Sequence, residues 1–190
     1  MSSTAVSVTA AVILIAVFLW AISVYNGLVR LSNLKEEAWS GMDVPLRRRF
    51  DLVPNLVETV KSCAPHERTA FQMFQMTAEA RGAVSAAPTR DARIEAEKAL
   101  TDMLRNLCAA AAAYPDLKTN TDFVELQREL SSLENEIQLA GRYYNSTVSD
   151  FNAAILAFPA ALISGRLGYA KAAMFGADDE PLVKEPVAAV

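Results

Sequence analysis

Histidine and cysteine are scarce in this chain, and both scarcities limit the chemistry open to it. Among 190 residues, His66 is the one histidine, and Cys63 and Cys108 are the two cysteines. Two cysteines are too few for a disulfide scaffold, and a lone histidine cannot build a metal cluster without several carboxylate partners. We expect both cysteines to be small core residues, and His66 to be solvated or hydrogen-bonded.

Sequence motifs of catalytic sites are also missing. The chain has no phosphate-binding loop, no Gly-x-Ser-x-Gly elbow and no His-Glu-x-x-His pair. Glu134 and Glu136 do not have the Glu-x-x-His spacing of di-iron bundles, and Glu125 and Glu129 flank Arg128 as on a solvated helix face. We therefore expect no enzymatic activity, no cofactor and no metal.

An excess of basic residues is absent, since 18 Lys and Arg stand against 22 Asp and Glu, for a net charge of −4. A nucleic-acid-binding protein needs positive charge to neutralise phosphates. We therefore expect no nucleic acid among the partners.

Charge is entirely missing from the first 29 residues, which contain a long apolar run. Residues 5–24, after a short tail at 1–4, are almost all apolar and would form about 30 Å of helix, the thickness of a hydrocarbon core. Trp20 and Tyr25 lie where interfacial aromatics are expected. A cleaved signal peptide is the alternative, but the run lacks a basic n-region and is longer than usual. We predict a retained transmembrane helix in contact with membrane lipid.

The orientation of this helix is predicted from its flanking charges. No Lys or Arg precedes it, whereas Arg30 and Lys35 follow it closely. The positive-inside bias then places the N-terminus outside and the following domain in the cytoplasm.

The rest of the chain has the apolar periodicity of helices, and no segment alternates as a strand would. We expect the membrane helix to continue to about Arg49 and to break at 51–55, where Asp51 can cap and Pro54 suits a first turn. A second helix should run to about Val84, kinked or split at Pro65. A loop at 86–89 should follow.

A third helix is expected over about 90–113 and a fourth from about Thr121 to Phe158-Pro159. The fourth has a long heptad-like apolar seam, typical of bundle or coiled-coil packing. Its members are Phe123, Leu126, Leu130, Leu133, Ile137, Ala140, Tyr144, Val148, Phe151, Ile155 and Phe158.

Four helices with short connections predict an all-α fold, in which the transmembrane helix continues into an antiparallel up-down four-helix bundle over 25–175. We expect the tail at 176–190 to be disordered. After Pro159, we expect the chain to pack on the base of the bundle or to lie in the membrane interface, with Arg166 and Lys171 toward headgroups.

The up-down arrangement would bring the turns Arg49–Asn55 and Tyr114–Asn120 together at the end of the bundle far from the membrane. Their polar residues could cap helix ends or bind a protein partner, and both readings stay open. The candidate partner-binding residues are Arg47, Arg48, Arg49, Asp51, Asn55, Tyr114, Asp116, Lys118 and Asn120.

Several stretches together resemble one known family. YNGLVRLSN from Tyr25, the stretch from Glu36 to Lys61, AYPDLKTNTDFVELQRELSSLENEI from Ala113 and RYYNSTVSDFNAAILAFP from Arg142 are similar to the LemA family. The resemblance covers about residues 25–168. It implies a transmembrane helix followed by a helical bundle in a bacterial inner membrane, or in a derived compartment such as a magnetosome.

The LemA family resemblance supplies no catalytic residues. We therefore expect a membrane-anchored, non-enzymatic scaffold or adaptor that acts by binding other proteins, with a homo-oligomer as one form that this binding can take. The alternative is an accessory regulatory subunit of an envelope stress or proteolysis system. The identity of the protein partners does not follow from the residues.

Overall fold

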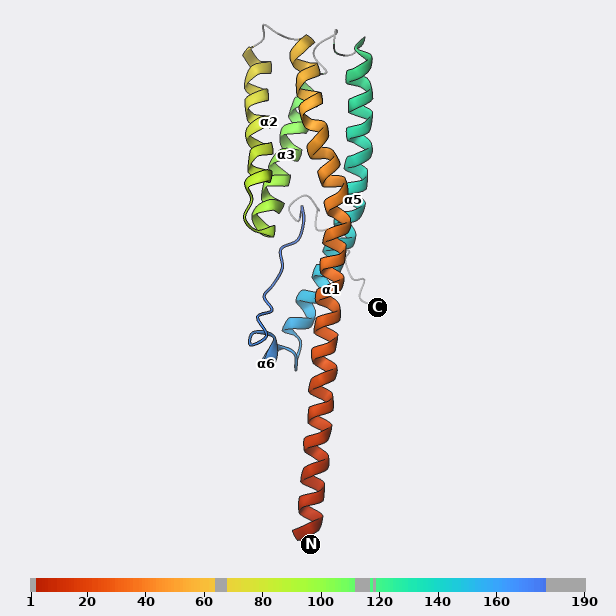
Figure 1. Ribbon diagram of the computed structural model, residues 1–190, viewed down its shortest axis with the longest axis vertical. Coiled ribbons are helices and arrows are strands. Elements are labelled where there is room, and N and C mark those ends of the chain that lie inside the picture. Colours follow the sequence, from red (N-terminus) through yellow and green to blue (C-terminus); the bar gives the residue numbers. More distant parts are fainter. Residues whose placement is uncertain (1–2, 64–67, 112–116, 118, 177–190) are drawn as a thin grey trace, which may run out of the picture. The chain divides into compact units, whose positions relative to one another are not determined.

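The structure, a computed structural model, describes residues 3–63, 68–111, 117 and 119–176. Every regular element in these stretches is a helix, which confirms the all-α prediction (Figure 1). The elements are α1 (Ser3–Cys63), α2 (Arg68–Ala86), α3 (Arg90–Ala111), α5 (Thr121–Leu156) and the short α6 (Ala161–Ser164). The loop expected before the third helix and the start of the fourth at Thr121 are confirmed.

The first helix is longer than the sequence predicts. α1 is continuous for 61 residues with Pro45 and Pro54 inside it, so the break expected at 51–55 is wrong. Proline at position 54 has no amide to donate to the Phe50 carbonyl one turn earlier. Arg81 of α2 donates its Nε–H to that carbonyl over 3.2 Å, and its guanidinium lies 4.0 Å from the centre of the Phe50 ring. Pro65, where we expected a kink or a split, lies outside the described residues, between the end of α1 and the start of α2.

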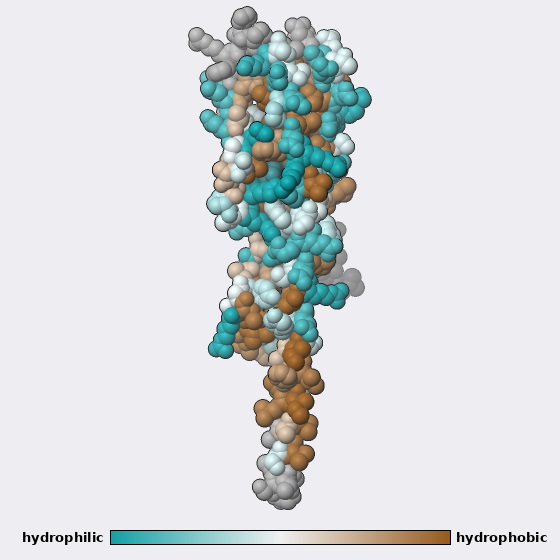
Figure 2. Space-filling model, viewed as in Figure 1, coloured by the Kyte–Doolittle hydropathy of each residue, from teal (hydrophilic) through white to brown (hydrophobic). Residues whose placement is uncertain are grey.

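The N-terminal part of α1 carries the apolar run. Among the described helices, α1 alone is long and apolar enough to cross a membrane; its most apolar window has a mean hydropathy of 2.5 and none of it is buried. Leu14 and Phe18 leave 70% and 67% of their surface exposed, and Figure 2 shows the hydrophobic colouring along this run. The helix is consistent with a membrane anchor, and a signal sequence would have the same properties.

The chain divides into two compact units, and α1 and α5 contribute residues to both. Unit 1 comprises residues 1–40 and 143–172, and unit 2 comprises residues 41–142 and 173–190. The expected tail at 176–190 lies outside the described residues except for Gly176.

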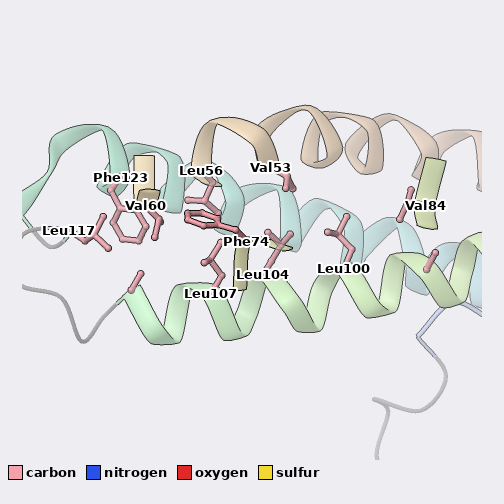
Figure 3. Close-up of a cluster of buried hydrophobic side chains, with 12 residues drawn as sticks. Val53, Leu56, Val60, Phe74, Val84, Leu100, Leu104, Leu107, Leu117 and Phe123 are labelled. Carbon is pink, nitrogen blue, oxygen red and sulfur yellow. The ribbon is translucent and has the colours of Figure 1, made fainter. Parts of the chain in front are cut away.

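Unit 2 has a hydrophobic core to which α1, α2, α3 and α5 all contribute (Figure 3). Within this core, α2 and α3 are neighbours, joined by the three-residue connection 87–89. Thr89 begins α3 by accepting the Ala92 amide on its hydroxyl at 3.2 Å, which is a helix N-cap. The buried members are Val53, Leu56, Val60, Phe74, Val84, Ala96, Leu100, Leu104, Leu107, Ala111, Leu117 and Phe123.

Unit 1 has a smaller core between the two long helices. Leu28 of α1 packs with Phe151, Ile155 and Ala160. Trp39 of α1 meets the Tyr144 ring edge-to-face at 5.3 Å between centroids, and Lys35 places its Nζ 4.4 Å above the Phe151 ring. Such contacts add to area burial.

The apolar seam predicted for the last long helix is confirmed from Phe123 to Ile155, where every member is buried or half-buried. Phe158 is not part of it. α5 ends at Leu156, and the Phe158 side chain is 81% exposed. The chain leaves the helical path before Phe158, so this ring does not continue the inward face.

Candidate functional site

The predicted turn Arg49–Asn55 does not exist, because these residues lie inside α1. Asp51 and Asn55 are exposed in the middle of a helix, where the backbone amides that a cap would bond are already used by the helix itself. Their predicted capping role is therefore wrong. Their predicted role in binding a partner stays a prediction.

The second predicted turn is described in part. Tyr114, Asp116 and Lys118 lie outside the described residues. Asn120 caps α5: its Oδ1 accepts the Phe123 amide at 2.9 Å and its carbonyl accepts the Val124 amide at 3.1 Å. The capping prediction for Asn120 is confirmed.

The three consecutive arginines of α1 face different surroundings, since successive residues of a helix point about 100° apart. The side chains of Arg47 and Arg48 are 76% and 63% exposed, whereas that of Arg49 is fully buried. Arg47 bonds Asp43 one turn earlier at 3.1 Å. Arg48 lies 3.8 Å from a carboxylate oxygen of Glu136 on α5.

Arg49 is the centre of a buried polar cluster in unit 2. Its two terminal nitrogens donate to Glu97 Oε2 at 2.6 Å, to Thr101 Oγ1 at 2.7 Å and to Glu134 Oε2 at 3.2 Å. Glu97 and Thr101 belong to α3 and Glu134 to α5, so one guanidinium joins α1 to both helices. We call these four residues, with Arg93 and Asp43, the ionic cluster.

Arg93 and Asp43 form the more exposed edge of the ionic cluster. Arg93 of α3 pairs with Asp43 of α1 at 2.5 Å and lies 3.8 Å from Glu97 Oε1. Their side chains are 26% and 24% exposed, against 1% for Glu97. Two arginines therefore face three carboxylates, and the deepest pair, Arg49 and Glu97, is neutral as a pair.

Sequence patterns indicate Arg49 of the ionic cluster as a candidate functional residue, but not Glu97. The sequence predicts Arg49 to be a tip residue, because the proline at position 54 favours a break. Glu97 was missed, although its spacing of three residues from both Ile94 and Leu100 puts it on the inward face of α3. Both neighbours are buried, so an acid between them needs a buried cation, and Arg49 supplies it.

The chemistry of this arrangement favours structure over catalysis. Arg49 and Glu97 are 0% and 1% exposed, so a substrate cannot reach them, and their charges already bond each other. Over residues 3–63, 68–111 and 119–176, no three His, Cys, Asp or Glu side chains are placed to share a metal ion. The cluster joins α1 to α3 and α5 through the bonds of Arg49.

Comparison with known proteins bears on the same part of the chain. The model of the LemA family matches residues 38–188. The chain belongs to the LemA family. The resemblance predicted from the sequence is thereby confirmed. No match was found among curated proteins.

The LemA match begins at Ala38 and includes the ionic cluster, α2, α3, α5 and α6. The apolar run at 5–24 lies ahead of it. The evidence for a membrane segment is therefore the exposed apolar helix of this chain, independent of the LemA match.

Proposed function

We propose that this LemA-family protein is a membrane-anchored, non-enzymatic scaffold or adaptor of a bacterial inner membrane or a compartment derived from it. The observation that carries the proposal is the continuity of α1. One unbroken helix, Ser3–Cys63, has an exposed apolar run near its start and supplies Val53, Leu56 and Val60 to the core of unit 2. The proposed membrane segment and part of the core of unit 2 thus belong to the same helix, α1.

The cost of exposing the apolar run supports a retained anchor. Fully burying one large aliphatic or aromatic side chain is favourable by about 1.5–3 kcal/mol, and the run displays many such side chains with none buried. Lipid supplies that burial, and no other described part of unit 1 does so. In this proposal the four helical segments of α1, α2, α3 and α5 form the antiparallel up-down bundle.

The proposed partner surface is the exposed face of α1 beside the ionic cluster. Four of the candidate residues lie on it at helical spacings: Arg47, Arg48, Asp51 and Asn55 are all exposed. Because Arg49 of the same stretch is buried and paired with Glu97, this part of α1 is fixed against α3. A fixed, charged helix face suits docking of a protein with complementary charge.

In-cell photo-crosslinking tests this surface. A photo-reactive residue replacing Asp51 in the full chain should capture a discrete protein, and Arg48→Glu in the same chain should remove that crosslink without changing protein level. Arg105→Glu on α3 is the matched control, because the Arg105 side chain is 66% exposed and Arg48 is 63% exposed. Crosslinks that survive Arg48→Glu, or vanish equally with Arg105→Glu, would contradict a docking face on α1.

The proposed orientation has the N-terminus outside and the domain in the cytoplasm, because Arg30 and Lys35 follow the apolar run. A reporter fused after Val190 should be active in the cytoplasm and inactive outside it. The reverse pattern would refute the orientation and leave the anchor standing.

A further inference from the structure

The segment that follows α5 has its polarity reversed relative to a surface exposed to water. Its inward positions are small: Ala160 and Ser164 are both 7% exposed. Its outward positions are large and apolar: Phe158 is 81% exposed and Leu162 is 67% exposed. Phe158 lies in the turn between α5 and α6, and Leu162 lies in α6 itself.

Hydrogen bonds attach this segment to α5 and close its last helical turn. The Ser164 hydroxyl donates to the Ile155 carbonyl in the last turn of α5 at 3.1 Å. Tyr169 donates its amide to Ser164 at 3.0 Å and Gly168 donates to Gly165 at 3.3 Å, while Gly168 has a φ of 78°. This is a Schellman ending, in which glycine supplies the left-handed residue. These bonds fix the turn at 164–169 against the end of α5, next to Leu162 of α6.

A second set of contacts attaches residues farther along the chain, Tyr169 and Ala172, to α5. The Asn152 side chain accepts the Ala172 amide at 2.9 Å and donates to the Ala172 carbonyl at 3.0 Å. The Tyr169 ring meets Phe151 edge-to-face at 5.7 Å between centroids. Residues 157–172 thus leave the end of α5 and return to contact it at Phe151 and Asn152. We call this stretch the excursion.

Within unit 1 this excursion lies beside α1 where the apolar run ends. Ala160 belongs to the same core cluster as Leu28, and Val24 and Tyr169 pack against that cluster. Val24 is the last residue of the apolar run at 5–24. The exposed residues Phe158 and Leu162 therefore belong to a segment that packs beside the part of α1 that would leave a bilayer.

We propose that residues 156–167 are a second membrane contact, in which Phe158 and Leu162 enter the same leaflet that α1 leaves. This inference rests on the proposed retained anchor. The exposed side chains of Arg166 and Lys171 follow the apolar pair and suit anionic headgroups. The contact places α1 and the end of α5 at the bilayer together, so unit 1 meets the membrane at two points.

Spin-label accessibility in the full chain tests the proposal. The chain, with Cys63→Ala and Cys108→Ala, is reconstituted in vesicles of phosphatidylcholine and phosphatidylglycerol. Single labels are placed by Leu162→Cys, by Leu139→Cys on α5 of unit 2 and by Phe18→Cys in the apolar run. The three native side chains have the same exposure, 67%, so exposure to solvent alone predicts equal accessibility. Phe158→Cys is a second test position in case one label disturbs the fold.

We expect the label at position 162 to resemble the label at 18, with collisions favouring oxygen, which concentrates in lipid, over a water-soluble nickel chelate. The label at 139 should show the opposite preference. If the label at 18 favours lipid while those at 158 and 162 match 139, the second contact is wrong and the anchor stands. If the label at 18 itself favours water, the anchor fails. Dipolar broadening at 162 without lipid contact would indicate a second copy of the chain and overturn the proposal.

Discussion

Replacing Arg49 by methionine tests whether the ionic cluster stabilises the fold. The change keeps much of the side-chain length but leaves the Glu97 carboxylate, 1% exposed, without its cation at 2.6 Å. Removing one partner of a buried ion pair typically costs about 3–5 kcal/mol of unfolding free energy. We expect the lower end, about 3 kcal/mol, because Arg93 remains 3.8 Å from Glu97. Denaturant unfolding of the full chain in detergent micelles, followed by circular dichroism, measures it.

The neighbouring arginine is the matched control. Arg48→Met removes the same charge from the same helix, but its side chain is 63% exposed and its carboxylate partner is 3.8 Å away, so the expected cost is at most about 1 kcal/mol. The double variant Arg49→Met with Glu97→Met should recover most of the lost stability, since no buried charge then lacks a partner. Equal losses for Arg48→Met and Arg49→Met, or additive losses in the double variant, would refute this reasoning.

Three further predictions concern the packing, the caps and the thiol. Leu133→Ala should lower the unfolding free energy by about 2–5 kcal/mol, the usual loss for a buried leucine, whereas Gln127→Ala on the exposed face should lower it little; equal melting temperatures would contradict the assigned face. Asn120→Ala should cost about 1 kcal/mol as a lost N-cap, and Asn55→Ala, inside α1, should not; a larger loss at 55 would contradict the continuous helix. Burial raises the pKa of the Cys108 thiol, so its alkylation by iodoacetamide near neutral pH should be slower than in the unfolded chain, as peptide mapping would show, and equal rates would argue against burial.

Much of the fold follows from local signals in the sequence. The starts of α3 and α5 are predictable because Thr89 and Asn120 are good N-caps that precede periodic apolar positions. The seam of α5 was predictable because its spacing of three and four residues fixes one face. Phe158 continued that spacing but is exposed, because the helix had already ended at Leu156.

The ionic cluster could not be predicted in the same way, because its partners are far apart in the chain. Arg49 and Glu97 are 48 residues apart, and Arg49 and Glu134 are 85 apart. A run of three arginines looks like a solvated patch, and periodicity alone does not say which of the three points inward. Only the positions of Leu46, Val53 and Leu56, all buried, put Arg49 on the inner face.

The prolines of α1 show that the effect of a helix-breaking residue depends on contacts outside its own helix. Proline costs a helix one backbone bond and crowds the preceding turn, and that cost predicted an end near position 51. At Pro54 the freed carbonyl of Phe50 receives Arg81 Nε–H at 3.2 Å from α2, and the same guanidinium stacks on the Phe50 ring. At Pro45 the freed carbonyl belongs to Gly41, an exposed residue, while Pro45 itself is buried. At Pro54, tertiary structure therefore supplies the missing bond. The helix continues through both prolines, and the core of unit 2 receives Val53, Leu56 and Val60 in uninterrupted register.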